Sequence, residues 1–348
     1  MATALTGALL QLLAHSSSST VGTVAHLNAA CCGAVAYADC WGFTAGQAAT
    51  TSIQSALDCQ AAHTVVVRNM GSPWIVTPDT VVIPRADKPP GTRAALNFSS
   101  NQLVIFKAGT VIEAKRWDFH GEGDSLGWVG LQNEWVHAST KYSGGGPVRN
   151  LTIRGEEGAV WRMWKADYQT SCPKGSPEPA ANSSAKCYSP SGQRHGLVIW
   201  SGVGITVSGL TIENTGGDGI ETGGLERAGD TSLRTREVWL KDLVLRDNNR
   251  QGMSVISALG LLVEDTIFSR TNGTDPSAGD HFAYYYPCYS VFARSSVSAT
   301  ATASLSLTEC VRVSLLFLFM MLLLLLFVHQ ALIHFIFLDS LRIFPISL

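Results

Sequence analysis

Two carboxylates lie close together in the segment GDGIETG, where Asp218 and Glu221 are three positions apart. Paired carboxylates suit glycoside hydrolysis, in which one donates a proton and the other acts as base or nucleophile. His195 and Arg250 occupy related positions in segments that align with this one, and Asp247 just precedes the later segment. An imidazole or guanidinium group could also serve the proton abstraction of a polysaccharide lyase. We therefore predict these five residues as catalytic candidates.

A structural role for the same residues stays open at this stage. The Asp of a GDG turn often caps backbone amides, and a His at a strand start is often only a hydrogen-bonded groove residue. Side chains at positions i and i+3 of a strand face opposite sides. Asp218 and Glu221 therefore share a face only if the turn at Gly219 alters the alternation.

Three segments of this region follow one template, with glycine in third place and an apolar residue after it. They are RHGLVIW (194–200), GDGIETG (217–223) and RQGMSVI (250–256). Their alignment stacks the following sets: His195, Asp218 and Gln251; Gly196, Gly219 and Gly252; Leu197, Ile220 and Met253; Val198, Glu221 and Ser254. The glycines are 23 and 33 residues apart (219 − 196 and 252 − 219). Repetition at this period with short β-rich units predicts a parallel β-solenoid, in which stacked coils share one core.

A second template runs beside the first in GLTIENT (209–215), DLVLRDN (242–248) and DTIFSRT (265–271). The segment NLTIRG (150–155) has the same pattern and predicts a further coil upstream. Apolar residues at helical spacing predict a short amphipathic helix over residues 47–59, placed to cap the open end of the solenoid. Residues 118–146 and 165–193 are expected to form long loops that wall a groove.

The stretch RHGLVIWSGVGITVSGLTIENTGGDGIETGG and the later NNRQGMSVISALGLLVEDTIFSRTNGT resemble the right-handed β-helix proteins of the pectate-lyase-like superfamily. The resemblance covers residues 39–279 and implies an all-β fold, a right-handed parallel β-helix. The superfamily includes polygalacturonases, pectate and alginate lyases, tailspike glycosidases and members without an assigned reaction. The polygalacturonase site is not carried over, because NTGGDG lacks its Asp pair and RHG lies upstream rather than downstream.

Cysteines and glycosylation sequons favour the secretory pathway, with the protein extracellular or membrane-anchored. Cys172 and Cys187 bracket an irregular loop and could pair, as could Cys40 and Cys59. Four sequons occur, at Asn97, Asn150, Asn182 and Asn272. The N-terminal segment 1–38 has a short apolar run with no basic residue before it, which makes it a poor signal peptide.

The C-terminal part differs in composition from the rest, because all 33 glycines lie at or before Gly279. We expect the β-helix over 39–282, a low-complexity linker over 283–310, a single transmembrane helix over 311–340 and a short tail over 341–348. A gene-model error after about residue 279 is the alternative origin of this tail.

The formal net charge of −2, without a basic run, gives no indication of a nucleic-acid partner. We expect no cofactor and no metal site. The function expected is a carbohydrate-active protein, a glycoside hydrolase or polysaccharide lyase that cleaves an acidic or sulfated polysaccharide. The alternatives are a non-catalytic β-helix that binds glycan or serves as a surface structure, and an inactive truncated member.

Overall fold

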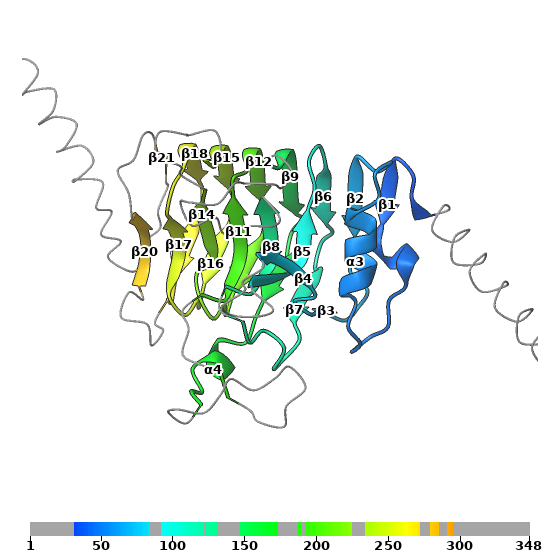
Figure 1. Cartoon of the computed structure of the whole chain (residues 1–348), viewed down its shortest axis with the longest axis horizontal. Coiled ribbons are helices and arrows are strands. Elements are labelled where there is room, and N and C mark those ends of the chain that lie inside the picture. The colour runs from blue at the N-terminus through cyan, green and yellow to red at the C-terminus, as the bar shows by residue number, and fades with distance from the viewer. Residues whose placement is uncertain are drawn as a thin grey trace, which may run out of the picture. The chain divides into compact units, whose positions relative to one another are not determined.

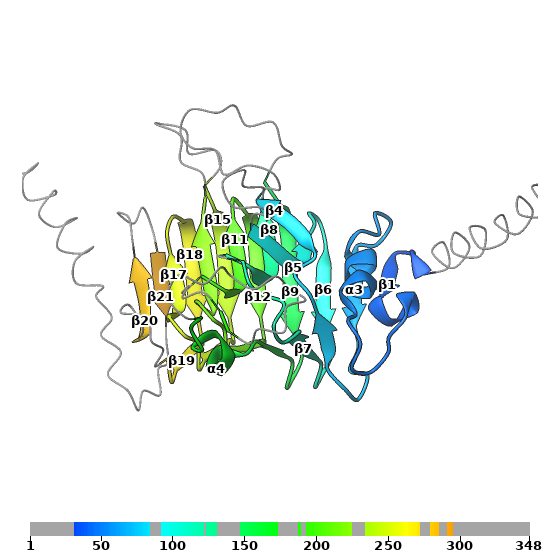
Figure 2. The ribbon, with the colours of Figure 1, turned by 60° about the horizontal axis from the view of Figure 1, so that its bottom comes forward.

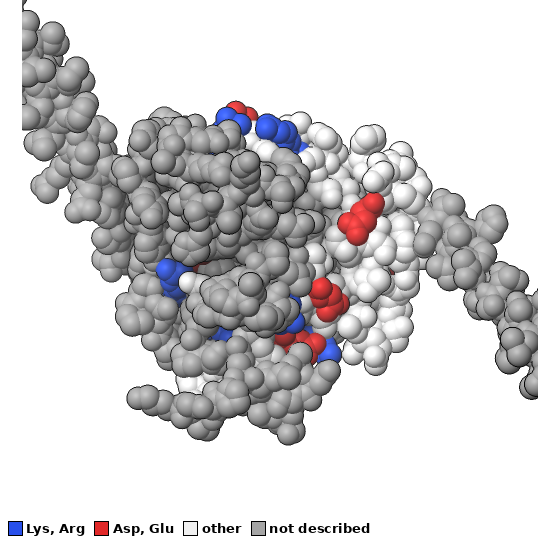
Figure 3. All heavy atoms as spheres, viewed as in Figure 1, with Lys and Arg blue, Asp and Glu red and all other residues white. Residues whose placement is uncertain are grey.

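The chain is mostly β-structure built from three sheets of nearly all parallel strands, seen in two views of the computed structural model (Figures 1 and 2). The structure describes residues 31–83, 92–121, 123–130, 147–172, 187–188, 193–224, 234–271, 279–284 and 291–294. On the face in Figure 3, the described charged side chains are scattered rather than gathered in one patch of a single sign.

Each sheet contains strands that are far apart in sequence and adjacent in space. Sheet A contains, in spatial order, β1 (Val35–Tyr37), β2 (Thr64–Val67), β6 (Leu103–Phe106), β9 (Arg149–Gly155), β12 (Val203–Ser208), β15 (Arg236–Lys241), β18 (Leu259–Glu264) and β21 (Val291–Arg294). Sheet B contains β19 (Ile267–Ser269), β16 (Val244–Arg246), β13 (Thr211–Glu213), β10 (Val160–Arg162), β7 (Val111–Ala114) and β3 (Trp74–Val76). Sheet C contains β20 (Gly279–Tyr284), β17 (Gln251–Val255), β14 (Ile220–Gly223), β11 (His195–Trp200), β8 (Ser125–Gly130), β5 (Thr92–Phe98) and β4 (Thr80–Ile83).

From β5 onward the chain visits sheets C, A and B in turn, so that each coil contributes one strand to each sheet. Among the described strands, all pairs are parallel except β4 with β5, which are antiparallel. Strands rich in Val, Ile and Leu favour this arrangement, because their inner side chains stack into a shared core. The core side chains include Leu197, Ile220 and Met253, which are fully buried.

The predicted register of both repeat templates is confirmed. In sheet C, Leu197 pairs with Ile220 and Ile220 with Met253, as the first template requires. In sheet B, the strands of the second template pair in the predicted order, β13 with β16 and β16 with β19. The repeats therefore correspond to two different sheets of the same coils.

The upstream coil predicted from NLTIRG exists, but its alignment with GLTIENT was wrong. This segment forms β9 of sheet A, where Leu151 pairs with Ile205 and Ile153 with Val207 of β12. The GLTIENT strand β13 instead pairs with β10 in sheet B. The same alternation of apolar and polar residues suits any sheet with one buried face, so the pattern does not identify the sheet.

The helix predicted over residues 47–59 is present as α3 (Thr50–Leu57). Its buried residues Ile53, Ala56 and Leu57 belong to the main core, and Gln102 donates a hydrogen bond to the Leu57 carbonyl. The described part of the chain has two shorter helices, the 3-10 helix η1 (Ala38–Trp41) and α4 (Lys165–Tyr168). The helical turn α4 lies within the predicted loop 165–193, much of which is outside the described residues.

The cysteines of the described segments form three disulfides. The Cys172–Cys187 pair is confirmed. The Cys40–Cys59 pair was wrong, because Cys40 bonds to Cys31 and Cys59 to Cys32. The two adjacent cysteines 31 and 32 bring the start of β1 against both η1 and the end of α3, an arrangement that spacing alone did not indicate.

The sheets begin before residue 39 and continue beyond residue 282, since β1 starts at Val35 and β21 ends at Arg294. The predicted transmembrane helix over 311–340 lies outside the described residues, as do the N-terminal residues 1–30. Among the described residues, no helix is long and apolar enough to cross a membrane.

Candidate functional site

A glycine corner at the start of β11, β14 and β17 positions the candidate residues. A Cβ on Gly219 would lie 2.6 Å from the Gly252 carbonyl oxygen, and one on Gly196 would lie 2.2 Å from Cγ2 of the core residue Ile212. The glycine therefore faces inward, and the next residue, such as Ile220, also enters the core. Two consecutive inward positions interrupt the strand alternation.

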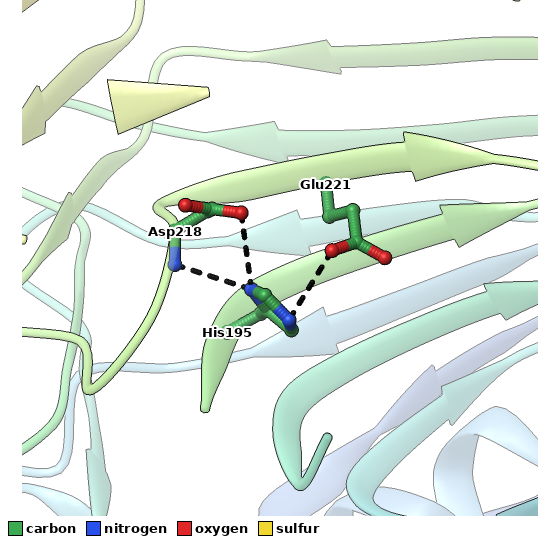
Figure 4. Close-up of side chains that lie close together, drawn as sticks. All are labelled: His195, Asp218 and Glu221. Carbon is green, nitrogen blue, oxygen red and sulfur yellow. Dashed lines mark hydrogen bonds and ion pairs between the residues drawn. The ribbon is translucent and has the colours of Figure 1, made fainter. Parts of the chain in front are cut away.

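The corner places Asp218 and Glu221 on the same outer side of the coil, together with His195 of the preceding coil (Figure 4). His195 Nδ1 lies 3.6 Å from Asp218 Oδ2, and His195 Nε2 lies 3.3 Å from Glu221 Oε2. Asp218 and Glu221 therefore share a face, because the turn at Gly219 alters the alternation of side chains along the strand. In Figure 4 the second Glu221 oxygen points away from the imidazole.

The backbone fixes the tautomer of His195. The Asp218 N–H donates a hydrogen bond of 3.1 Å to Nδ1, so Nδ1 carries a lone pair and no proton in the neutral ring. The ring proton then lies on Nε2, which faces Glu221 at 3.3 Å. His195 thereby offers a hydrogen-bond donor to the Glu221 carboxylate.

Asp218 is held from the following coil. Arg250 Nη1 lies 3.2 Å from Asp218 Oδ2, and the Ser254 hydroxyl lies 2.7 Å from the same oxygen. Ser254 also contacts the side-chain oxygen of Gln251. Asp218 is fully buried, and its Oδ1 has no hydrogen-bond partner among the described residues.

Burial shifts the proton affinities of all three groups toward their neutral forms. The pKa of His195 falls to about 4, because desolvation outweighs the opposing effect of Asp218. Desolvation raises the pKa of Asp218 to about 6 against the charges of His195 and Arg250. Desolvation also raises the pKa of Glu221 to about 7, with Arg250 opposing the shift. Glu221 is therefore a carboxyl group that exchanges its proton near neutral pH.

The same three residues have donor atoms suited to a divalent cation, although the sequence predicted no metal site. One ligand atom from each of His195, Asp218 and Glu221 lies within 4.8 Å of the others. The Arg250 guanidinium already contacts Asp218, so a cation there would meet a positive charge at close range. His195 Nδ1 is also occupied by a backbone N–H. The arrangement favours proton chemistry over metal binding.

Four of the five predicted residues come together, and Asp247 lies apart from them. Asp247 occupies a turn with φ of 57° and pairs with Arg270 through a hydrogen bond of 2.9 Å. That ion pair lowers the pKa of Asp247. Ser254 and Gln251 were not predicted, although both appear in the repeat alignment, directly beyond Glu221 and Asp218. Their proximity to the two carboxylates could have been inferred from that register, although Ser254 lies beside Glu221 in the stack and bonds diagonally to Asp218.

A buried arginine supports the strand that carries His195. Arg194 donates to the backbone carbonyls of Phe119 at 2.7 Å and His120 at 2.9 Å. Its guanidinium lies 5.4 Å and 5.0 Å from the ring centroids of Tyr168 and Tyr188. A fully buried guanidinium needs such carbonyl and aromatic partners to offset desolvation. Segments distant in sequence are thereby tied to the start of β11.

Asp124 also supports the start of β11. It is fully buried and bonded to Arg93 at 2.6 Å, and its carbonyl accepts the His195 N–H at 3.2 Å.

No protein-family model matches the chain, and no curated protein matches it by sequence. Solved structures with a similar fold include the following two. One, a 1,3-α-1,4-β-D-galactose-4-sulfate-3,6-anhydro-D-galactose-2-sulfate 4 galactohydrolase, has 14% identity and a TM-score of 0.40 over 69% of this chain and 46% of its own. The other, from Parabacteroides merdae and provisionally described as a glycosyl hydrolase, has 12% identity and a TM-score of 0.43 over 78% of this chain and 100% of its own. This likeness is too distant to assign a family or an activity.

Proposed function

We propose that the protein cleaves an acidic polysaccharide, with Glu221 as the group that exchanges a proton with the substrate. The observation that carries this proposal is a carboxyl whose pKa is raised to about 7 by burial on the outer side of sheet C. A catalytic acid or base works best when its pKa lies near the working pH. Glu221 is also less buried than its partners, with a side chain 13% exposed against 4% for His195 and 0% for Asp218.

The division of roles follows from burial. Asp218 is fully buried, so it orients His195 through its backbone N–H and does not reach a sugar. His195 holds Glu221 through Nε2 and leaves the other carboxylate oxygen for the substrate (Figure 4). Arg250, with a side chain 15% exposed, supplies the positive charge that an acidic sugar requires.

These roles favour β-elimination over hydrolysis. Hydrolysis requires two carboxylates that reach the glycosidic bond, and Asp218 is enclosed. Elimination requires one base and a cation near the uronate carboxylate. Ionised Glu221 takes the C5 proton, the C5–H electron pair forms the C4–C5 double bond, and the C4–O bond breaks. The leaving oxygen then takes a proton from water, and Arg250 offsets the carboxylate charge.

The direction of the pH dependence separates the two reactions. As a base, Glu221 must be ionised, so elimination should rise as the pH increases through about 7. As a general acid, Glu221 must be protonated, so hydrolysis should fall across the same interval. Release of reducing ends, together with ultraviolet absorbance of an unsaturated product, identifies which reaction occurs.

The test is Glu221→Gln assayed on polygalacturonate, alginate and a sulfated galactan. Loss of a catalytic proton-transfer group should lower turnover by roughly 10²–10⁴-fold. Glu237→Gln is the matched control, because Glu237 is an exposed glutamate on β15. Equal turnover by wild type and Glu221→Gln would contradict the assignment.

A non-catalytic glycan-binding β-helix is the second candidate, favoured by the near-complete burial of His195 and Asp218. In that case the wild type would bind one of these polysaccharides without releasing products, and Glu221→Gln would bind it equally well.

The finer features of the fold belong to the same proposal. We propose that the coils form a right-handed β-helix capped by α3, since crossovers between parallel strands are right-handed in about 98% of cases. An experimental structure tests the hand. We also propose a secreted or membrane-tethered location, supported by the three disulfides. Fractionation of cells that express the full chain, with and without residues 311–340, tests the tether.

A further inference from the structure

The outer side of sheet C carries an indole that the proposed chemistry does not use. Trp200 ends β11 and pairs in register with Gly130 of β8 and Gly223 of β14, so neither neighbour in the stack presents a side chain. A Cβ on Gly223 would lie 2.6, 2.7 and 3.2 Å from three carbons of the Trp200 ring. Several ring atoms lie at similar short distances from one point above Gly223, so the indole lies flat over that glycine.

The ring is supported from its own side of the sheet as well. Trp128, 2% exposed, stacks on Trp200 with ring centroids 6.4 Å apart and planes 19° apart. Trp128 and Val198 form a small apolar cluster on this face, against which Trp200 packs. Trp128 and Val198 are buried, whereas Trp200 is partly exposed. The cluster therefore holds one indole flat on the sheet with part of its surface accessible.

This indole lies close to the proposed catalytic carboxyl. Glu221 and Gly223 are two residues apart on β14 and face the same side, which corresponds to roughly 6–7 Å along the strand. Since Trp200 covers Gly223, its ring is next to Glu221 on the side opposite Asp218 and Arg250. A sugar unit stacked on the ring would therefore be one of the two units linked by the glycosidic bond that faces Glu221.

The geometry points to Trp200 as the stacking platform of a sugar subsite, which rests on the proposed function of Glu221. The ligand class is a pyranose with a continuous C–H face, which packs on a flat aromatic ring. The adjoining unit of the same polymer carries the carboxylate or sulfate that Arg250 contacts. The proposal thus gives the site one apolar and one cationic end, with the scissile bond between them.

Affinity measured without turnover tests the platform separately from catalysis. Wild type, Glu221→Gln and the double variant Glu221→Gln/Trp200→Ala are titrated calorimetrically, as full chains, with polygalacturonate and sulfated-galactan oligosaccharides. Trp239→Ala in the Glu221→Gln background is the matched control. Trp239 is 40% exposed on β15 of sheet A, and its indole N–H bonds to Glu264. Trp200→Phe, which keeps a flat ring, is the conservative variant.

The expected result is a loss of affinity of tenfold or more for Trp200→Ala, equivalent to ~1.4 kcal/mol. Trp200→Phe should recover most of it, and Trp239→Ala should bind as well as its parent. If all the variants bind equally while Glu221→Gln abolishes turnover, the platform is refuted and the catalytic proposal survives. If Trp200→Ala weakens binding but the wild type cleaves nothing, the subsite stands and the catalytic proposal fails. Binding of neither oligosaccharide by the wild type overturns both.

Discussion

Replacing Glu221 by Gln should make the folded protein more stable at alkaline pH. Desolvation raises the pKa of this group from 4.5 to about 7, so the native state holds the proton more tightly than the unfolded chain does. Between these two values the native state binds more protons than the unfolded state, and the free energy of unfolding therefore falls as the pH rises. The neutral Gln side chain removes this loss and retains an oxygen that can accept the His195 Nε2–H bond.

The magnitude follows from the shift. A difference of about 2.5 pKa units at 1.36 kcal/mol per unit corresponds to about 3 kcal/mol, fully developed above pH 7. At pH 5, Glu221 is mostly protonated in the native state and partly protonated in the unfolded chain. The difference in free energy of unfolding between Glu221→Gln and wild type should therefore be less than about 1 kcal/mol. The free energies of unfolding of wild type and Glu221→Gln should thus diverge progressively as the pH increases.

Urea unfolding followed by tryptophan fluorescence at pH 5 and pH 8 measures both values. Glu237→Gln, which changes an exposed carboxylate on β15, should match the wild type at each pH. Equal stability of Glu221→Gln and wild type at pH 8, or a gain that is larger at pH 5, would refute the claim that Glu221 is desolvated. The basis of its proposed catalytic role would then be lost as well.

Two further predictions concern the coils. Gly219→Ala should lower the free energy of unfolding by roughly 1–3 kcal/mol, because the added Cβ would lie 2.6 Å from the Gly252 carbonyl oxygen. Gly33→Ala is the control and should be nearly neutral, since no atom lies closer than 3.9 Å to its added Cβ. Thermal melts compare the two variants. In a eukaryotic secretory host, the sequon at exposed Asn150 should be glycosylated, and the sequon at Asn97, which is only 5% exposed, should not. Peptide mass spectra measure both, and a glycan on Asn97 would contradict the burial of this residue in β5.

The coil register could be predicted from the sequence because it depends on close steric contacts that restrict the type of residue at certain positions. Gly196, Gly219 and Gly252 each face the inside of a corner where a Cβ would meet a backbone or side-chain atom at 2.6 Å or less. Glycine fits at these three positions, so the residue recurs in the coils of β11, β14 and β17, and the alignment follows from it. The apolar residue after each glycine is buried for the same geometric reason.

Features that do not restrict the residue type in this way were predicted poorly. NLTIRG was aligned with the wrong strand, since alternation alone is the same in sheets A and B. The partner of Cys59 was missed, because a disulfide depends on the distance between two Cα atoms, here 5.6 Å for Cys32 and Cys59, and not on sequence spacing. Asp247 looked equivalent to Asp218 in type and neighbourhood, yet its turn directs it to Arg270.

The candidate site and the fold depend on the same corner. A regular strand would place Asp218 and Glu221 on opposite faces, and the pair would have no chemistry in common. Because Gly219 and Ile220 both enter the core, the two carboxylates come to the same side and meet His195 from the preceding coil. The glycine that closes the coil therefore also assembles the site, so a substitution there should remove stability and proton chemistry together, whereas Glu221→Gln should remove only the chemistry.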